Sequence, residues 1–338
     1  MQRLNYIGSK YKLLDWITDA IRDHTQWESF EQKRIADLFA GTGIVSYHFR
    51  TLGATVFSND AELYSSVIAH AMTVSTYTER CKTCIETWSG EEVGYITRNY
   101  SPYEAQDRMF FTVENAQRID YLRHRLEDEV NDLTHDEYMF LLASLILSAD
   151  MVSNVPAVYG CYLKQFKEKA KKPLVFTPVH TLTVPAHPDS TTWKSNLTDG
   201  TSPVYIQRMD AVYLDPPYNE RQYSKNYFPL NVIAMTPTEQ TALTLTGKTG
   251  IPVNSFVSPF CSKRNALQAF KDVLTHLQTD WIFLSYSNEG ILSKDQLLEV
   301  GSEFGTVTLI EKPYKRFKSF AYNESGDTIE YLFCIRTR

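Results

Sequence analysis

The sequence predicts an α/β fold with a mixed, mostly parallel sheet and a smaller helical lobe. Near the amino terminus, a short apolar run over residues 35–39 leads into a glycine-rich turn and a helical pattern, and residues 54–57 form a second apolar run. This order of strand, turn, helix and strand is a βαβ unit, which joins parallel strands. Residues 78–157 are instead helical in pattern and highly charged. Strands and helices alternate again near the carboxyl terminus, so we expect a lobe inserted into one sheet domain.

The pattern divides the chain into two parts. Residues 1–77 and 192–338 form the predicted α/β domain, and residues 78–191 form the helical lobe with a basic segment. Residues 162–201 are rich in Lys, Thr, Pro and Ser without a sustained period, so we expect them to be exposed and adaptable. The lobe is predicted to contain helices over 118–130 and 138–151, and the last part of the chain strands over 211–214, 281–286, 306–310 and 330–336 with helices over 265–277 and 294–301.

Composition favours a soluble cytoplasmic protein. The 338 residues are 43% hydrophobic and 22% charged, which is typical of a folded globular chain. We find no apolar run suited to a signal peptide or a membrane span, so no membrane partner is expected. Five cysteines, an odd number, indicate free thiols in a reducing compartment. Cys81 and Cys84 lack a second pair at zinc-finger spacing, so we expect ordinary thiols and no metal site.

The glycine-rich turn DLFAGTG over residues 37–43 is the first candidate binding site. Glycines at the start of a helix let backbone N–H groups approach a ligand closely. The third glycine of the dinucleotide fingerprint is missing, which favours a nucleoside cofactor over a dinucleotide. Asp60 ends the next strand, where such folds place a carboxylate that accepts both ribose hydroxyls. A lone turn of this kind can also simply reverse the chain.

The tetrapeptide Asp215-Pro216-Pro217-Tyr218 is the strongest chemical signal. It follows the predicted strand 211–214, and its two prolines fix φ and end the ladder of hydrogen bonds. The Asp215 carboxylate and the Pro216 carbonyl are thereby held outside the sheet edge. These two acceptors match the two hydrogens of an amino group on a planar base, and accepting them would free the nitrogen lone pair to attack an electrophilic methyl group. Tyr218 would stack on the base.

Four blocks of sequence together resemble the Dam-like DNA adenine-N6 methyltransferases of the restriction-modification type. They are YIGSK (6–10), DLFAGTG (37–43), Asn59-Asp60 and LDPPYNERQYSKNYF (214–228). The resemblance covers nearly the whole chain, and it is strong in these blocks and weak over residues 78–191. It implies a Rossmann-like class I methyltransferase fold, S-adenosylmethionine as the cofactor and a smaller helical lobe that recognises DNA.

The resemblance also implies roles for individual residues. In that family the first two blocks hold the methionine part of the cofactor, the position of Asp60 holds its ribose, and a carboxylate matched to Asp199 by spacing alone contacts its adenine. Many members have Gly-Gly-Lys where this chain has IGSK, which leaves Lys10 in place. The expected cofactor residues are Tyr6, Ile7, Gly8, Ser9, Lys10, Asp37, Leu38, Phe39, Ala40, Gly41, Thr42, Gly43, Asp60 and Asp199.

The mechanism that the resemblance implies is direct methyl transfer to N6 of an adenine flipped out of double-stranded DNA. Positioning and polarisation of the amine supply most of the rate, and neither a nucleophilic cysteine nor a metal is required. The proton released on methylation goes either to water or to Asp215. The expected catalytic residues are Asp215, Pro216, Pro217 and Tyr218.

Three basic clusters stand out against the net charge of −6. Cations interleaved with aromatics suit phosphate contact and stacking, although any one such run is also typical of a solvated face. Arg221 and Tyr223 follow the tetrapeptide, where they are placed to fill the gap left by a flipped base or to clamp its phosphate. The expected DNA-binding residues are Lys164, Lys167, Lys171, Lys172, Arg221, Tyr223, Lys225, Lys263, Arg264, Lys315, Arg316 and Lys318.

Other functions remain open at this point. A cytosine-N4 methyltransferase would use the same polarisation of an amine, but Asp at position 215 and the order of the motifs favour adenine. RNA and protein-glutamine methyltransferases usually begin the tetrapeptide with Asn. An intact tetrapeptide and an intact turn argue against a silent binding module. A cognate restriction endonuclease is a candidate partner, alongside phage-borne and solitary alternatives.

Overall fold

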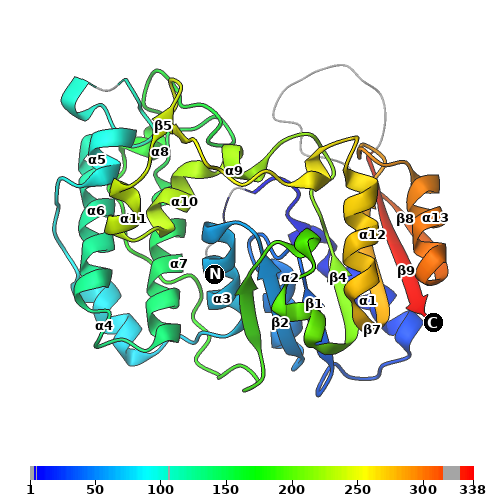
Figure 1. Ribbon diagram of the computed structural model, residues 1–338. Coiled ribbons are helices and arrows are strands. Elements are labelled where there is room, and N and C mark those ends of the chain that lie inside the picture. The colour runs from blue at the N-terminus through cyan, green and yellow to red at the C-terminus, as the bar shows by residue number, and fades with distance from the viewer. Residues whose placement is uncertain (1–3, 5, 106, 315–327) are drawn as a thin grey trace.

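The computed structural model describes residues 4, 6–105, 107–314 and 328–338. Within them, seven strands form one sheet in the order β3-β2-β1-β4-β7-β9-β8 (Figure 1). The first five strands in this order, β3, β2, β1, β4 and β7, are parallel to one another. Strand β9 runs antiparallel to both of its neighbours, β7 and β8. The predicted mixed, mostly parallel sheet is therefore confirmed. The strands are β1 (Arg34–Asp37), β2 (Thr55–Asp60), β3 (Thr191–Lys194), β4 (Arg208–Leu214), β7 (Gln278–Ser287), β8 (Gly305–Tyr314) and β9 (Thr328–Thr337).

Helices cover both faces of the sheet, which is why its central strands are apolar on both sides. Ile35 belongs to the apolar cluster that contains the side chains of α1 and α2. The next residue, Ala36, belongs to the cluster on the opposite face with α12 and α13. This alternation is the two-residue period of a strand. The helices are α1 (Leu14–Thr25), preceded by the 3₁₀ helix η1 (Lys10–Leu13), α2 (Ile44–Thr51), α12 (Ala266–His276) and α13 (Lys294–Phe304).

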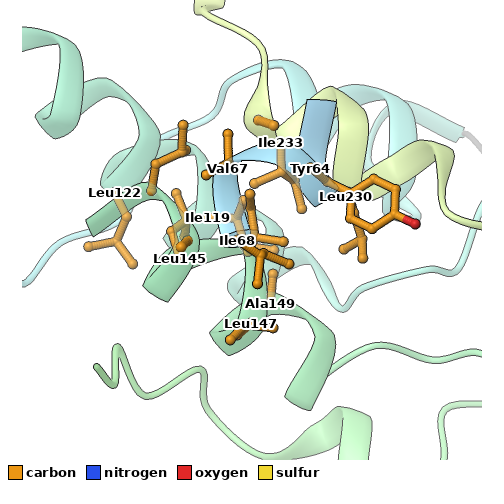
Figure 2. Packing of buried hydrophobic residues seen from close by; sticks show 14 of the residues in the cluster. Tyr64, Val67, Ile68, Ile119, Leu122, Leu145, Leu147, Ala149, Leu230 and Ile233 are labelled. Carbon is orange, nitrogen blue, oxygen red and sulfur yellow. The ribbon is translucent and has the colours of Figure 1, made fainter. Parts of the chain in front are cut away.

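A separate group of helices forms the lobe beside the sheet. Its core is a third apolar cluster, in which Ile119 and Leu145 of the lobe meet Ile68 of α3 and Leu230 of α10 (Figure 2). Helix α3 thus connects the sheet to the lobe. The lobe helices are α4 (Glu79–Thr87), α5 (Tyr95–Tyr100), α6 (Val113–Asp128) and α7 (His135–Met151), with the short η2 (Tyr103–Ala105). Helices α3 (Leu63–Thr73) and α10 (Phe228–Ala234) pack against them.

Helix α7 is the centre of the lobe, and its sequence explains both its start and its burial. The Thr134 hydroxyl accepts from the Glu137 backbone N–H, and the Glu137 carboxylate accepts from the Thr134 N–H. Such a capping box typically stabilises a helix by about 1 kcal/mol. The run from Phe140 to Asp150 is buried on every side, so the helix is apolar all round rather than amphipathic.

Segments that follow the tetrapeptide pack on the lobe and not on the sheet. The Tyr100 hydroxyl donates a 2.9 Å hydrogen bond to the Gly250 carbonyl, and the buried Arg123 donates through Nε to the Met235 carbonyl at 2.8 Å. Residues on both sides of the tetrapeptide thus build this part of the molecule. The segments are α9 (Tyr223–Asn226), α10, α11 (Pro237–Thr241) and the hairpin of β5 (Leu245–Thr246) and β6 (Ile251–Pro252).

The stretch 162–201 contains more regular structure than the sequence indicates. It holds the edge strand β3, which pairs in parallel with β2, a single helical turn in α8 (Glu168–Lys171) and the 3₁₀ helix η3 (Leu197–Asp199). Strand β3 has the sequence TTWK and only one partner strand, so it lacks the apolar run of the central strands. Two further 3₁₀ helices, η4 (Pro203–Ile206) and η5 (Pro259–Cys261), lie in the connections around the sheet.

All five cysteines are free thiols, as the odd count predicts. Cys81 and Cys84 are buried in the core of the lobe, and burial raises the pKa of both. Among the described residues, no group of three or more His, Cys, Asp or Glu side chains is arranged to hold a metal ion. None of the helices in the described ranges combines the length and apolarity needed to cross a bilayer.

Candidate active site

A pocket that is partly open to solvent lies where β1, β2 and β4 end. The order of the strands reverses between β1 and β4, and α/β folds bind ligands at such a reversal. The amino-terminal segment 6–10, the turn 37–42, Asp60, the tetrapeptide 215–218 and Tyr223 all line it. Blocks far apart in the sequence are therefore brought together.

The glycine-rich turn is held by the carboxylate that ends β2. Asp60 accepts from the Gly41 N–H at 2.8 Å through Oδ2 and from the Glu62 N–H at 2.9 Å through Oδ1. Gly41 and Gly43 have φ of 54° and 67°, a left-handed conformation that favours glycine. Burial raises the pKa of Asp60, while the backbone N–H groups oppose the rise. Asp60 thus shapes the turn as well as facing the pocket.

Asp37, at the end of β1, has one carboxylate oxygen satisfied and one without a partner. The backbone N–H and the hydroxyl of Ser46 donate to Oδ2 at 3.1 and 2.7 Å. Oδ1 is buried and accepts no hydrogen bond from the described residues. Burial raises the pKa of Asp37 to about 7, against the lowering effect of Ser46. A buried acceptor of this kind is suited to a cationic ligand group.

The amino-terminal segment lies against the helix that follows the tetrapeptide. The Ile7 N–H donates to the Tyr227 hydroxyl at 2.9 Å, and the Tyr223 hydroxyl donates to the Ile7 carbonyl at 3.1 Å. The ring of Tyr6 stacks on Tyr227 with centroids 5.2 Å apart. A Cβ on Gly8 would lie 3.6 Å from the Tyr223 hydroxyl. These contacts fix the backbone that leads to Lys10.

Lys10 joins the amino-terminal segment to the tetrapeptide. Its Nζ lies 3.0 Å from Asp215 Oδ1 and 3.7 Å from Glu330 Oε2, and its side chain is only 3% exposed. Burial lowers the pKa of Lys10, but Asp215 and Glu330 outweigh it and the net shift is upward. Burial raises the pKa of Asp215 to about 6, although Lys10 opposes the rise. Lys10 therefore stays charged between two acids.

The rest of the tetrapeptide also faces the pocket. Pro216, Pro217 and Tyr218 are lining residues. The Tyr218 carbonyl accepts from the Ile291 N–H at 2.8 Å, and the Lys10 ammonium lies 5.6 Å from the centroid of the Tyr218 ring. The ring packs edge-on against Tyr286. Backbone and ring contacts thus both hold Tyr218 beside the acid.

Two expected cofactor residues do not line the pocket. Gly43 caps α2, and a Cβ there would meet Met72 at 2.9 Å, so its role is conformational. Asp199 is exposed, and its Oδ1 accepts from the N–H and the hydroxyl of Thr201. Ser195, Asn196 and Leu197 face the pocket in its place.

Several lining residues were not expected from the sequence. Phe260 packs edge-on against Phe39 at 5.1 Å and forms an apolar wall. Glu62 is buried, accepts from Asn231 Nδ2 at 2.6 Å, and burial raises its pKa to about 7. The only sequence signal for Glu62 was its position two residues after Asp60. Further members of this set are Ile44, Val45, Asn59, Ala61, Ser195, Asn196, Leu197, Tyr213, Phe256, Ser258 and Pro259.

The expected DNA-binding residues fall into distinct groups. Arg221, Lys225, Lys263 and Arg264 are exposed beside the pocket. The segments that carry these residues are joined by three hydrogen bonds. Gln222 Nε2 donates to the Ser258 carbonyl, and Gln222 Oε1 accepts from the Ser258 N–H. The Ser224 hydroxyl donates to the Phe256 carbonyl. Lys263 also lies 3.8 Å from Glu220. These four cations thus share one rim.

The remaining basic residues differ in their surroundings. Lys164 and Lys172 are exposed, Lys167 is half-buried with its ammonium donating to the Val155 carbonyl, and Lys171 pairs with Glu168 at 2.7 Å. Tyr223 lies in the pocket wall and bonds to Ile7, so its hydroxyl is engaged inside the protein. Lys315, Arg316 and Lys318 lie outside the described residues.

The sequence of this chain is similar to a known protein family and to several known proteins. The family model described as D12 class N6 adenine-specific DNA methyltransferase matches residues 6–299. The type II methyltransferase M.CviAII of Paramecium bursaria Chlorella virus 1 is 37% identical over 99% of both chains, and M.NlaIII of Neisseria lactamica is 35% identical over 98% of this chain and 99% of its own. M.FokI of Planomicrobium okeanokoites is 32% identical over 98% of this chain but 52% of its own. The matches span both the pocket and the lobe.

Proposed function

Because this chain belongs to the D12 class of N6 adenine-specific DNA methyltransferases, we propose that its pocket binds S-adenosylmethionine and receives a flipped adenine from double-stranded DNA. The family and the type II relatives make the chain a site-specific DNA methyltransferase that modifies N6 of adenine. The observation that carries the proposal is the presence of the turn 37–42 and the tetrapeptide 215–218 in one pocket. One pocket can therefore present an amine to a methyl donor.

The pocket fits the cofactor in charge and shape. S-adenosylmethionine supplies an electrophilic methyl group on a sulfonium, and it also carries an ammonium group. Asp37 Oδ1, buried without a partner among the described residues, would accept from that ammonium. Asp60 is placed for the ribose hydroxyls, and Phe39 with Phe260 offers an apolar wall for a planar ring. Ser195 and Asn196 would provide polar contacts where Asp199 was expected.

The tetrapeptide would bind and polarise the target amine. Lys10 engages Oδ1 of Asp215, so we assign Oδ2 and the Pro216 carbonyl to the two N–H groups of adenine. As the N–H hydrogens are held, the nitrogen lone pair turns toward the methyl group. The N–C bond forms while the S–C bond breaks, and the nitrogen then loses one proton. With a pKa raised by burial to about 6, Asp215 is a suitable acceptor near neutral pH.

The lobe and the basic rim would bind the DNA. We keep the division into an α/β part, residues 1–77 and 192–338, and a lobe, residues 78–191, with α10, α11 and the hairpin packed onto the lobe. Arg221, Lys225, Lys263 and Arg264 would contact phosphates at the mouth of the pocket. The relatives' description as type II methyltransferases supports a cognate restriction endonuclease as a partner of the system.

The test measures methyl transfer from labelled cofactor to two kinds of DNA duplex. In one the candidate target amine is on adenine, and in the other it is on cytosine. Activity is expected on the adenine duplex alone. Asp215→Asn should abolish transfer and keep cofactor binding, since Lys10 still finds a side-chain oxygen. Asp280→Asn is the matched control, because Asp280 is an exposed acid paired with Arg208 on the sheet surface. Full activity of Asp215→Asn, or labelling of cytosine, would contradict the proposal.

A further inference from the structure

Glu330 is a buried acid next to the tetrapeptide that no sequence motif indicated. It lies at the start of β9 with 7% of its side chain exposed, 3.7 Å from the Lys10 ammonium. Its Oε2 accepts no hydrogen bond from the described residues. A buried carboxylate is unfavourable unless a nearby charge compensates it, so the ion pair with Lys10 is the reason that Glu330 can stay there.

The direction of β9 explains why Glu330 reaches Lys10. Asp37 and Asp215 each lie two residues beyond a side chain, Ile35 or Tyr213, that faces α1 and α2. Because β9 is antiparallel to β7, its amino-terminal end lies at the sheet edge where the parallel strands finish. Glu330 is two residues before Leu332, which faces the same side. Strand alternation therefore places all three acids on the same face of the sheet, where Asp215 and Glu330 lie beside the Lys10 ammonium.

We propose that Glu330 is a positioning residue for methyl transfer, which holds the Lys10 ammonium between two carboxylates so that Lys10 neutralises Asp215 only in part. This role rests on the proposed function of Asp215. Without the charge of Glu330, Lys10 would be attracted to Asp215 alone. Asp215 would then be a weaker acceptor for the amine and for its proton.

Other ionisable groups surround Lys10, Asp215 and Glu330, and these groups stay unchanged in the test. Asp37 and Tyr213 face Asp215 from β1 and β4, and Tyr218 and Tyr223 face it from the segment that follows. On β8, Lys312 is the cross-strand partner of Glu330, and its ammonium lies 5.5 Å from the Trp16 ring centroid. On β7 the partner is the uncharged Ser287. The experiment therefore compares variants within one fixed background.

Single-turnover rates of methyl transfer, measured from about pH 5 to 9 with saturating cofactor and duplex DNA, separate positioning from binding. Glu330→Gln should move the acid limb of the profile to lower pH and reduce the plateau about tenfold, with cofactor affinity near that of the wild type. Lys10→Met should move the limb in the opposite direction. Glu330→Asp keeps the charge and should keep the wild-type limb. Glu311→Gln on β8, an exposed acid paired with Lys294, should change nothing.

The opposite shifts of the two variants are the outcome that loss of structure alone would not give. A Glu330→Gln profile that coincides with the wild type, or whose acid limb moves to higher pH, would overturn the role of Glu330. An unmoved limb in Lys10→Met would do the same. Asp215→Asn separates this failure from a failure of the proposed function. If Asp215→Asn is inactive while Glu330→Gln is unchanged, only the role of Glu330 is lost.

Discussion

The Tyr223 hydroxyl donates a 3.1 Å hydrogen bond to the Ile7 carbonyl, and this bond ties the segment after the tetrapeptide to the segment that leads to Lys10. The two residues are 216 positions apart in the chain. Both sides of the pocket are thereby fixed with respect to each other. The geometry of the site therefore depends on the hydroxyl of a residue that the sequence predicts to bind DNA.

Tyr223→Phe should weaken cofactor binding, because the Ile7 carbonyl loses its donor. One hydrogen bond corresponds to about 1 kcal/mol, or roughly a fivefold rise in Kd. Isothermal titration with S-adenosylmethionine checks this. Tyr121→Phe, on α6 beside Arg118 and away from the pocket, is the control and should bind as the wild type does. Equal affinities of the two variants would contradict this role for Tyr223.

Asp37→Asn should make the empty protein more stable at pH 8 and impair cofactor binding. The unfolded chain releases the Asp37 proton near 3.8, whereas the folded protein keeps it to about 7. The folded state therefore binds more protons between these values, and the free energy of unfolding falls as the pH rises through them. The neutral amide removes this loss, which is on the order of 2–4 kcal/mol. Melting temperatures at pH 5 and pH 8 measure the effect.

The pH dependence of S-adenosylmethionine binding is a second test of the Asp37 carboxylate. A cationic ligand prefers the ionised carboxylate, so wild-type affinity should rise as the pH increases through about 7. In Asp37→Asn the affinity should be lower and the rise smaller. An Asp37→Asn variant that melts at the wild-type temperature at both pH values, and binds with the wild-type pH dependence, would show that Asp37 is not the group responsible.

Gly43→Ala should destabilise the fold by about 1–3 kcal/mol. The position has a φ of 67°, and the added Cβ would meet Met72 Cβ at 2.9 Å. Gly247→Ala isolates the backbone contribution, since Gly247 has a φ of 68° and open space around it. Urea unfolding should show the larger loss for Gly43→Ala. A loss no greater than that of Gly247→Ala would mean that Met72 adapts to the methyl group.

Lys263→Ala and Arg264→Ala should weaken binding of duplex DNA across sequences and each reduce the salt slope by about 1. Lys167→Ala should change the slope less, because the Lys167 ammonium already bonds to the Val155 carbonyl. Binding titrations at several salt concentrations give the slopes. A larger change for Lys167→Ala would move the DNA contact from the rim of the pocket to the lobe.

Features of the fold that depend on a local sequence pattern are predicted correctly from the sequence. The turn that begins at Asp37 and the tetrapeptide that begins at Asp215 both follow apolar strands, and parallel strands bring such ends to one edge of a sheet. The long helix α7 was predicted from its apolar run and begins only three residues earlier than expected. Periodicity and strand-ending residues therefore predicted the central strands, helix α7 and two parts of the pocket, whereas the segment 6–10 was expected from the family resemblance and the edge strand β3 was not predicted.

Contacts set by the tertiary structure were beyond these patterns. Glu330 belongs to the site only because β9 is antiparallel, and its neighbours in sequence give no sign of this. Asp199 was matched by spacing, but a 3₁₀ turn directs its carboxylate to Thr201. Residues 162–201 are predicted to be exposed, with Lys167 binding DNA, yet Lys167 is half-buried and its ammonium donates to the Val155 carbonyl. The direction of a strand, the orientation of a turn and the partners of a buried charge can be read only from the three-dimensional structure.

The hydrogen bond between the Ile7 N–H and Tyr227 spans 220 positions, and Glu330 comes still later. A nascent chain on the ribosome therefore cannot place Glu330 beside Lys10 until β9 has emerged. Contacts of such long range tend to form late and slowly in folding. A translation product interrupted before β9 should accordingly be unable to modify DNA.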